Sequence, residues 1–368
     1  MPRALWCSVT HTNLPIGVDW RWQMENAICN VEDLPPAVLP PRELDAARDA
    51  AGVFPLSVTP YYLSLIDPSD PDDPIRKMVV PNGLELEHVH GLRDDPIDEE
   101  KHSPMPGLIH RYPDRALLLV SGRCAVNCRH CTRRRLGEGR VSPLDEKGFA
   151  GAISYLHRHP EIRDVILSGG DPLLEDETRL ESILNTVRSV PSVEIVRVGT
   201  RIPVTLPMRV TEGLAKLLSR YHPLYVNTQF NHVREVTEQA ARAVSHLVDA
   251  GIPVSNQSVL LKGVNDTARD VEQLCRALLR IRVRPYYLFL CDLWDGLDHF
   301  RTPIATGIDI MERLRGRLSG LGIPQLMVDL QGGIGKVPLL PNYIVSKEKG
   351  YTVLRSPDGQ IAHYPDPQ

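Results

Sequence analysis

The sequence has no long hydrophobic run and almost no excess of charge of either sign. No uninterrupted apolar stretch approaches the roughly 20 residues that a transmembrane helix needs, and the beginning of the chain lacks the sustained apolar run of a signal peptide. The 42 Lys and Arg residues against 46 Asp and Glu residues leave a formal net charge of −4, which gives no support for binding nucleic acid or an anionic membrane. We therefore expect a cytoplasmic globular protein without a membrane or nucleic-acid partner.

Cysteine is also scarce, with seven in 368 residues. A secreted disulfide framework is normally short, dense in cysteine and even in count, so this usage argues against one. Three of the seven, Cys124, Cys128 and Cys131, fall within eight positions with the spacing C-x3-C-x2-C. Three thiolates suit a [4Fe–4S] cluster with one iron left open to bind and reduce a small molecule, because full protein ligation takes four cysteines. The alternative is a zinc site completed by His130 or a distant cysteine, although the second paired arm typical of zinc is missing.

The chain divides into three parts by pattern. Residues 1–106 hold short helical stretches between proline-rich breaks and predict an accessory, mainly helical region. Residues 107–341 alternate short apolar runs with amphipathic helical segments, which predicts right-handed βαβ units around a parallel sheet. Six or seven such units favour an α/β fold of the complete or partial (β/α) barrel kind. Residues 342–368 have short β-like runs and are expected to pack back on the barrel.

The apolar runs that predict strands are 116–120, 165–167, 193–198, 224–227, 254–261, 286–290 and 326–328. In such barrels the chemistry lies at the carboxyl ends of the strands and in the loops that follow them. Cysteine, glycine or polar residues follow five of the seven runs: Cys124, Gly169-Gly170-Asp171, Asn227 to Asn231, Asp292 and Asp329. Five such placements on one rim predict a single site.

A lysine stands in a glycine-rich stretch, QGGIGKVP (331–338), near the end of the predicted barrel. A P-loop would need glycine at position 330 and Ser or Thr after the lysine, and the chain has Leu330 and Val337 there. A lysine on a loop at a barrel mouth can instead form a Schiff base with an aldehyde, as pyridoxal phosphate enzymes require. Lys336 is the candidate for that role.

Charged residues near these runs can bind the ionic ends of a substrate and a cofactor. Asp292 and Asp329 each close a predicted strand on the same rim, and two carboxylates aimed into one cavity fit a cationic side chain such as an ammonium or guanidinium. Arg133, the first of three consecutive arginines, could pair with an α-carboxylate, while Arg111 and Arg115 could hold a phosphate. The alternative for each aspartate is a helix N-cap, and for the arginines an exposed basic surface.

Several of these segments together resemble the lysine 2,3-aminomutase family of pyridoxal phosphate-dependent radical S-adenosylmethionine enzymes. The resembling segments are CAVNCRHCTRRR (124–135), LSGGD (167–171), RVRPYY (282–287), CDL (291–293), HFRTP (299–303), GK (335–336) and PNY (341–343). Likeness at 19–23, 59–67 and 110–115 extends the resemblance nearly end to end. It implies a partial (β/α) barrel of the radical S-adenosylmethionine type. It also implies an isomerase that moves an amino group from C2 to C3 of an amino acid and converts L-lysine to β-lysine.

The resemblance also assigns residues to three cofactors and to the substrate. The implied residues are Cys124, Cys128 and Cys131 for the [4Fe–4S] cluster, His130, Gly169, Gly170, Asp171 and Gln257 for S-adenosylmethionine, Lys336, Arg111 and Arg115 for pyridoxal phosphate, and Arg133, Asp292 and Asp329 for the substrate. An electron donor such as a flavodoxin or ferredoxin and a homo-oligomer are implied as well. We expect no zinc site, because no cysteine follows Cys291 and Thr267 occupies the other zinc-ligand position of the clostridial-type enzymes.

Departures from the family pattern keep further interpretations open. Gln229 stands where relatives carry histidine, and Trp294 and Asp295 follow Asp292 where smaller or apolar residues are usual. An arginine 2,3-aminomutase is the nearest competing interpretation, because two carboxylates clamp a guanidinium as well as an ammonium. More distant possibilities are a relative that makes β-lysine for modifying a translation factor, a radical enzyme without pyridoxal phosphate, and a non-catalytic iron–sulfur or zinc protein.

Overall fold

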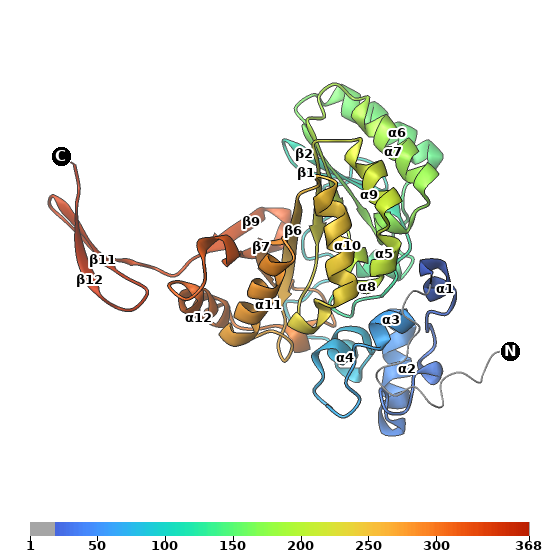
Figure 1. Ribbon diagram of the computed structural model, residues 1–368, viewed down its shortest axis with the longest axis horizontal. Coiled ribbons are helices and arrows are strands. Elements are labelled where there is room, and N and C mark those ends of the chain that lie inside the picture. Colours follow the sequence, from blue (N-terminus) through green and yellow to red (C-terminus); the bar gives the residue numbers. More distant parts are fainter. Residues whose placement is uncertain (1–18, 368) are drawn as a thin grey trace.

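The main feature of the fold is one large curved sheet. The computed structural model describes residues 19–367, so the first 18 residues of the predicted accessory region lie outside the described part. Within it, strands β1 to β9 form a sheet whose spatial order follows the chain order (Figure 1). The strands from β2 to β8 are parallel, and β1 and β9 pair antiparallel with β2 and β8 at the two edges. The strands are β1 (Leu108–Tyr112), β2 (Arg115–Ser121), β3 (Asp164–Gly169), β4 (Ile195–Gly199), β5 (Leu224–Thr228), β6 (Val254–Leu260), β7 (Arg284–Leu290), β8 (Gln325–Leu330) and β9 (Gly335–Leu339).

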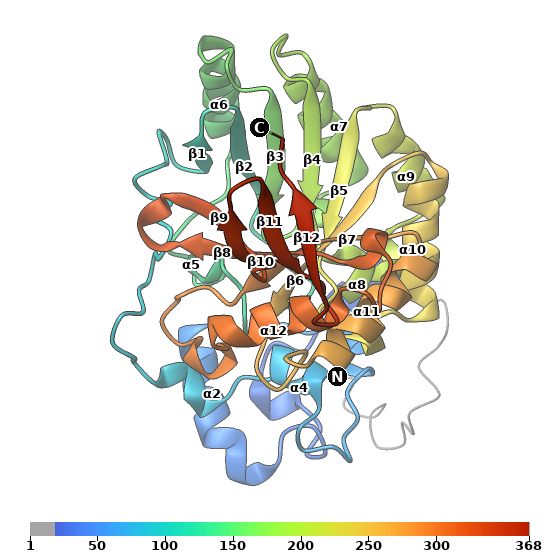
Figure 2. The same cartoon turned by 90° about the vertical axis from the view of Figure 1, so that its left-hand side faces the viewer.

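Helices alternate with the parallel strands, and the longer ones cover the outer face of the sheet (Figure 2). The longer helices are α6 (Glu146–Arg158), α7 (Glu177–Arg188), α9 (Glu212–Ser219), α10 (Glu238–Asp249), α11 (Ala268–Arg280) and α12 (Ile304–Leu314). The single turns α5 (Arg134–Gly137) and α8 (Ile202–Thr205) follow β2 and β4. Helix α10 illustrates why they form: it buries Ala240, Ala243, Val244 and Leu247 at the i, i+3, i+4, i+7 spacing, and the Thr237 hydroxyl caps its first turn. Among residues 19–367, no helix has the length and apolar character needed to cross a bilayer.

The barrel is partial. In the described part of the chain, no backbone ladder joins β1 to β9, so the sheet stays open between its two edge strands. We call this opening the seam. An ion pair spans it instead, in which Arg111 of β1 donates to Asp329 of β8. Asp329 also pairs with Lys336, its neighbour on strand β9. The sequence pattern allows a complete or a partial barrel, and the partial barrel is observed.

All seven predicted strands are present, in the predicted order, as β2 to β8. The sequence pattern does not predict β1 or β9, because the segments LIHRY and GKVPL carry charge and little apolar periodicity. The difference matters for Lys336, which lies in strand β9 and not in the glycine-rich loop where we expected it. That loop is limited to the turn η9 (Gln331–Gly333), and a strand restricts the direction of the lysine side chain more than a loop would.

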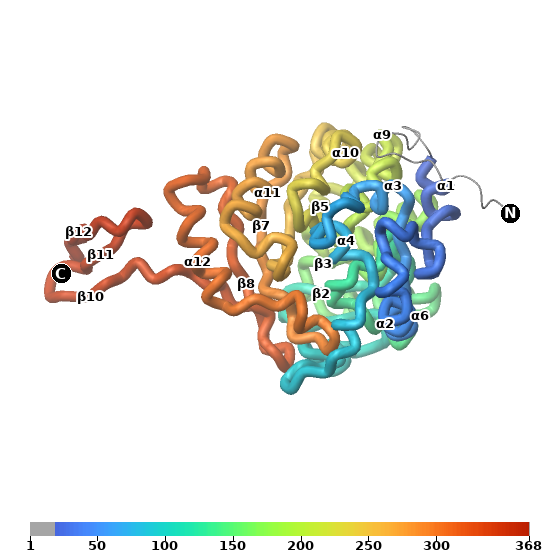
Figure 3. Tube along the Cα trace, turned by 90° about the horizontal axis from the view of Figure 1, so that it is seen from below, coloured from blue at the N-terminus to red at the C-terminus, as the bar shows by residue number. Residues whose placement is uncertain are grey.

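The accessory region consists of α1 (Trp20–Glu25), α2 (Leu44–Val53), α3 (Pro60–Leu63) and α4 (Pro74–Val79), grouped at one end of the barrel (Figures 1 and 3). It is packed tightly against the loop that carries the cysteines. The backbone N–H of Asn127 in that loop donates to the carbonyl of Ser57 at 2.9 Å. The Thr59 hydroxyl donates to the carbonyl of Thr205 at 2.9 Å, and Tyr62 is fully buried. The region therefore supports the loop as well as covering the barrel.

The C-terminal segment differs from the expectation that it packs back on the barrel. Strands β10 (Ile344–Glu348), β11 (Tyr351–Arg355) and β12 (Ile361–Pro365) form a second antiparallel sheet that projects away from the barrel (Figures 1 and 3). Because these strands satisfy one another's backbone hydrogen bonds, they need no edge of the main sheet. An ion pair of 2.5 Å between Arg355 and Glu312 ties the second sheet to α12.

Candidate active site

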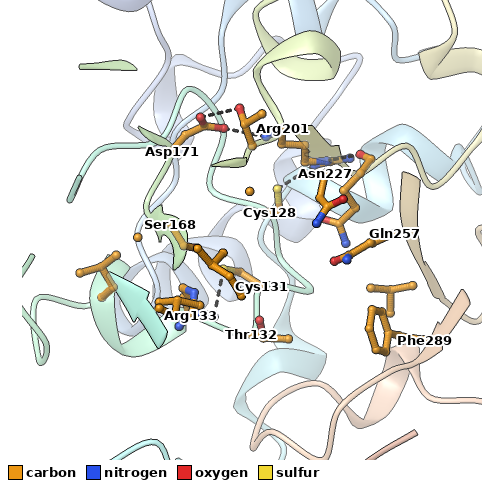
Figure 4. A pocket seen from close by; sticks show the side chains of 18 of the residues that line it. Cys128, Cys131, Thr132, Arg133, Ser168, Asp171, Arg201, Asn227, Gln257 and Phe289 are labelled. Atoms are coloured by element: carbon orange, nitrogen blue, oxygen red, sulfur yellow. Dashed lines mark hydrogen bonds between the residues drawn. The ribbon is translucent and has the colours of Figure 1, made fainter. Parts of the chain in front are cut away.

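A cavity of about 610 Å³ lies at the carboxyl ends of the parallel strands (Figure 4). Every residue that the sequence assigned to a cofactor or to the substrate lines it. These residues are Arg111, Arg115, Cys124, Cys128, His130, Cys131, Arg133, Gly169, Gly170, Asp171, Gln257, Asp292, Asp329 and Lys336. The volume is within the range of small-molecule sites. The predicted convergence on one rim is therefore observed, and the geometry below bears on the role of each residue.

The three clustered cysteines are free thiols in the loop after β2. Arg201 Nη1 donates to Cys128 Sγ at 2.7 Å, and the backbone N–H of Arg133 donates to Cys131 Sγ at 3.2 Å. Burial, with the charge of Cys128, raises the pKa of Cys131 to about 11, and burial also raises the pKa of Cys124. Thiols in such a place stay protonated unless a metal takes the proton's position, and N–H donors aimed at sulfur favour that exchange. The residues thus fit a [4Fe–4S] cluster.

The loop between the second and third cysteines is fixed by buried charges. Arg129 is completely buried, and its Nε and Nη2 donate to the two carboxylate oxygens of Glu85 at 2.8 and 2.6 Å. Arg134 also donates to Glu85, at 3.2 Å, and Arg129 Nη1 donates to the carbonyl of Phe54 at 2.9 Å. Glu85 belongs to the turn η3 (Gly83–Leu86) of the accessory region. Removing one member of this triad would leave an unpaired buried charge, so the triad holds the cysteine loop in one geometry.

Gly169 and Gly170 allow the loop after β3 to lie directly against the cysteine loop. Gly169 has a φ of 125°, and a Cβ there would be 2.2 Å from the carbonyl oxygen of Ser121. A Cβ on Gly170 would be 2.3 Å from the carbonyl oxygen of Arg123. No other residue type fits either position without moving backbone. The glycine pair therefore shapes this side of the cavity, whatever contact it makes with a bound molecule.

Asp171 braces two loops to each other. Its carboxylate accepts hydrogen bonds from the Thr200 hydroxyl at 2.6 Å, the Arg201 backbone N–H at 2.7 Å and the Leu173 backbone N–H at 3.1 Å. Burial raises the pKa of Asp171 to about 6, and these hydrogen bonds oppose the rise. The structure thus gives the carboxylate a bracing function between the loops after β3 and β4. Because Asp171 also lines the cavity, the S-adenosylmethionine contact that the resemblance implies stays a prediction.

His130 lies under the cavity with one ring nitrogen uncommitted. It is buried, and its Nε2 accepts a hydrogen bond from Asn231 Nδ2 at 3.0 Å, while Nδ1 is a buried atom without a partner in the described part of the chain. Burial, with the charge of Arg201, lowers the pKa of His130 well below its ordinary value. The ring is therefore neutral, and its Nδ1–H can donate to a bound molecule. Gln257 of β6 faces the same space (Figure 4), so both residues fit S-adenosylmethionine.

Lys336 lies at the seam, beside Asp329. The Lys336 ammonium pairs with one carboxylate oxygen of Asp329, and Arg111 Nη2 donates to the other at 2.6 Å. The side chains of Asp329 and Arg111 are 5% and 8% exposed, whereas that of Lys336 is 32% exposed. Its ammonium also lies 5.4 Å from the centroid of the Phe289 ring. The amine is accessible from the cavity and fits the aldehyde of pyridoxal phosphate.

Two arginines flank the Tyr112 ring close to this lysine. The guanidinium carbons of Arg111 and Arg115 are each 4.9 Å from the ring centroid. Arg115 donates to its neighbour Asp114 at 2.9 Å, and Arg111 donates one of its N–H groups to Asp329. Both arginines keep further N–H donors, because a guanidinium has five. A pair of cations on one wall fits a phosphate, although each already has a carboxylate partner.

Asp292 follows β7 and shares the cavity with Asp329. Burial raises the pKa of Asp292 to about 7, the charge of Asp329 adds to the rise, and Lys336 and Arg111 oppose it. A cation bound between the two carboxylates would favour the ionised form. Trp294 is buried and, like Asp295, is not among the residues that line the cavity. The two unusual residues after Asp292 therefore contribute no side chain to the cavity wall.

The three consecutive arginines do not form a solvated basic surface. Each pairs with an acidic residue of the accessory region, in the pairs Arg133–Glu99 at 2.7 Å, Arg134–Glu85 at 3.2 Å and Arg135–Asp95 at 3.0 Å. Of the three, Arg133 lines the cavity, together with Glu99. Sequence reasoning missed Glu99, Glu85 and Arg201. Only Arg201 had a usable signal, because it closely follows a predicted strand on the same rim.

These features define a class of enzyme. Three cysteines in the C-x3-C-x2-C spacing stand at the carboxyl ends of the strands of a partial parallel barrel, above a glycine-lined loop. The model of the Radical SAM superfamily matches residues 118–278, which contain all three cysteines. The chain is thus a radical S-adenosylmethionine enzyme, a class that uses a [4Fe–4S] cluster and S-adenosylmethionine, and the residues that line the cavity fit both.

More particularly, the chain belongs to the lysine 2,3-aminomutase family. The family model described as Lysine-2,3-aminomutase matches residues 311–368. The chain is 47% identical to the L-lysine 2,3-aminomutase of Acetoanaerobium sticklandii over 350 residues, which cover 95% of this chain and 84% of that protein. It is 40% identical to the glutamate 2,3-aminomutase of Clostridioides difficile, covering 95% and 83%, and 35% identical to the L-lysine 2,3-aminomutase of Escherichia coli, covering 89% and 96%. The chain is therefore an isomerase, and the non-catalytic alternative is excluded.

Proposed function

We propose that this enzyme is an L-lysine 2,3-aminomutase that interconverts L-lysine and β-lysine with the help of pyridoxal phosphate. The proposal rests on one observation, which is the arrangement of positively and negatively charged side chains around one cavity. A guanidinium, Arg133, two carboxylates, Asp292 and Asp329, and the accessible amine of Lys336 all line the space that the three cysteines also line. An amino acid with a carboxylate at one end and a cation at the other complements this order.

The proposed roles follow from this geometry. Cys124, Cys128 and Cys131 hold the cluster, and Lys336 attaches pyridoxal phosphate, whose phosphate Arg111 and Arg115 bind. When bound, the cluster with S-adenosylmethionine supplies a 5′-deoxyadenosyl radical, and pyridoxal phosphate supplies a π-system through which nitrogen can pass between adjacent carbons. His130, Gly169, Gly170 and Gln257 are proposed to contact S-adenosylmethionine, with Asp171 supporting the loop beneath it, and the support for this is that all five line the cavity.

The chain's own side chains orient the substrate. Arg133 uses one terminal nitrogen for Glu99, which leaves donors for the substrate carboxylate. Asp292 and Asp329 bind the side-chain cation, and this binding favours ionised Asp292 over the protonated form. The amino acid is therefore held at both ends while its C3 faces the radical source. Holding both ends orients one carbon toward the reacting group.

A second candidate substrate is arginine, because a guanidinium can also lie between two carboxylates. Glutamate is disfavoured, since its side-chain carboxylate would face Asp292 and Asp329. We also propose an electron donor such as a flavodoxin or ferredoxin, a homo-oligomer and a cytoplasmic location, all by likeness to the family.

An anaerobic competition assay tests the substrate. Reconstituted, reduced enzyme with S-adenosylmethionine and pyridoxal phosphate receives equal concentrations of lysine, arginine and glutamate, and the β-isomers are measured by mass spectrometry after derivatisation. We expect β-lysine to predominate. Predominant β-arginine would show that arginine, the second candidate, is the substrate. A lack of any β-isomer from enzyme with a full iron content and bound pyridoxal phosphate would overturn the proposal.

A further inference from the structure

Arg201 is a buried arginine in direct contact with one of the cluster cysteines (Figure 4). It comes two residues after β4, and its side chain is 9% exposed. Every nitrogen of the guanidinium has a partner: Nη1 donates to Cys128 Sγ at 2.7 Å, Nε to the carbonyl of Gln229 at 3.1 Å, and Nη2 to the Tyr62 hydroxyl at 3.0 Å and to Glu235 Oε1 at 2.5 Å. The guanidinium is therefore fixed in place and aims one N–H at the sulfur.

The counter-charge of Arg201 is shared among several donors. Glu235 is completely buried, and its Oε1 accepts from the Tyr62 hydroxyl at 2.5 Å as well as from Arg201. Its Oε2 accepts from the backbone N–H groups of Asn231 and His232 at 2.5 and 2.9 Å. Glu235 bonds to Nη2 of the guanidinium, whereas Cys128 bonds to Nη1. The positive charge is therefore in direct contact with the sulfur, and the counter-charge is on another side of the guanidinium.

Two parts of the chain far apart in sequence hold this arrangement. Tyr62 belongs to α3 of the accessory region, and its ring also lies 5.4 Å from the guanidinium carbon. The backbone N–H of Arg201 is held by Asp171, in the loop after β3. Here the cation is clamped through its backbone and its side chain, and one donor remains for the sulfur.

We propose that Arg201 is a positioning residue that orients Cys128 and raises the reduction potential of the [4Fe–4S] cluster. Reduction adds one electron, taken from a one-electron donor, and converts the 2+ form of the cluster into the 1+ form without breaking an iron–sulfur bond. Because the reduced form is more negative, a fixed cation and an N–H donor at a ligating sulfur stabilise it more than the oxidised form. The inference rests on the radical S-adenosylmethionine class and is independent of the proposed substrate.

The test is a redox titration of the reconstituted cluster, without S-adenosylmethionine or substrate, followed by the electron paramagnetic resonance signal of the reduced form. Iron content per chain is measured in parallel. Arg201→Met removes the cation and should lower the midpoint potential. Glu235→Gln removes the counter-charge and leaves the arginine, so it should raise the potential. Opposite shifts from two members of one ion pair are not expected if the pair merely stabilises the fold.

A matched control is Arg209→Met, in the turn η5 (Pro207–Arg209). Arg209 is also buried and bonded to the carbonyls of Leu173 and Glu175 and to the carboxylate of Glu177, and within residues 19–367 it has no hydrogen bond to a cysteine. The cluster of the Arg209→Met variant should have the same midpoint potential as that of the wild type. If Arg201→Met does not retain iron, Arg201→Lys replaces it, with a smaller decrease expected. An unchanged potential in an iron-replete Arg201 variant, or a shift of Glu235→Gln in the same direction, would overturn the proposal.

Discussion

The two sides of the cavity are built differently. One side carries the three clustered cysteines, and we call it the cluster side. There the neighbouring strands are hydrogen-bonded to one another without a gap, and buried charged residues such as Arg129, Arg201 and Glu235 each have at least three hydrogen-bond partners. On the seam side, the sheet is open, and Asp329 forms two ion pairs, one with Arg111 across the seam and one with Lys336 on the neighbouring strand β9. Fixed partners suit a cofactor that stays in one position. Ion pairs at an opening suit a site where charges of an incoming molecule replace those of the chain.

The largest expected effect is on the cluster side. Cys131→Ala removes a cluster ligand, and the remaining two thiols cannot hold the cluster, so isomerisation should fall by at least about 10³-fold. Iron content after anaerobic reconstitution and the yield of β-amino acid measure the effect. Cys29→Ser is the control, because Cys29 is exposed and far from the cavity residues. Iron retention in Cys131→Ala equal to that of the control would contradict the ligand assignment.

An equally large effect on the other side should leave the cluster intact. Lys336→Ala removes the proposed attachment point of pyridoxal phosphate, so isomerisation should again fall by about 10³-fold or more while iron content stays at the wild-type level. Visible absorbance of the bound cofactor and iron content together separate the two sides. Lys347→Ala, in the projecting sheet, is the control. Full activity of Lys336→Ala would instead favour a radical enzyme that does not use pyridoxal phosphate.

A smaller effect is expected at the carboxylate-binding end. Arg133→Gln removes a charge-assisted hydrogen bond to the substrate, so kcat/KM for lysine should fall about 10- to 100-fold, mostly through KM. Lysinamide, which lacks the carboxylate, should lose much less. Arg220→Gln provides a control, since Arg220 pairs with Glu181 on the outer surface. Equal losses for lysine and lysinamide would show that Arg133 does not bind the carboxylate.

The same contrast explains how much the sequence could predict. The parallel strands follow from a local pattern and were predicted correctly. The cysteine spacing is also a local pattern, and it pointed to the radical S-adenosylmethionine class, which the family comparison confirms. The residues that were missed act across long separations: Glu85 meets Arg129 from 44 positions away, and Glu99 meets Arg133 from 34. No pattern in the sequence pairs those residues, because the accessory region folds over the barrel only in three dimensions. The glycine-rich segment around Lys336 indicated that this lysine is a candidate site residue. Strand β9 was not predicted, because it forms by pairing with the edge of β8.

The smallest expected effect concerns Asp292 and the pH dependence of stability without ligands. Burial holds the pKa of Asp292 at about 7 in the folded protein, whereas an unfolded aspartate titrates near 3.9. Between these values the folded state binds a proton that the unfolded state has released, so the contribution of Asp292 to the free energy of unfolding falls as pH rises from about 4 to 7 and is constant above that range. An asparagine at this position would not titrate. Asp292→Asn should therefore stabilise the cofactor-free protein by roughly 2–4 kcal/mol at pH 8 and by much less at pH 5.

Urea unfolding of the two proteins at pH 5 and pH 8 measures this difference. Asp309→Asn is the matched control, because Asp309 is an exposed carboxylate on α12 that pairs with Arg313. Its effect should be small and nearly the same at the two pH values. An Asp292→Asn difference that does not grow with pH would mean that Asp292 is ionised throughout. The seam would then hold two charged carboxylates before any substrate arrives, and the pairs of Asp329 with Arg111 and Lys336 would have to stabilise both of them.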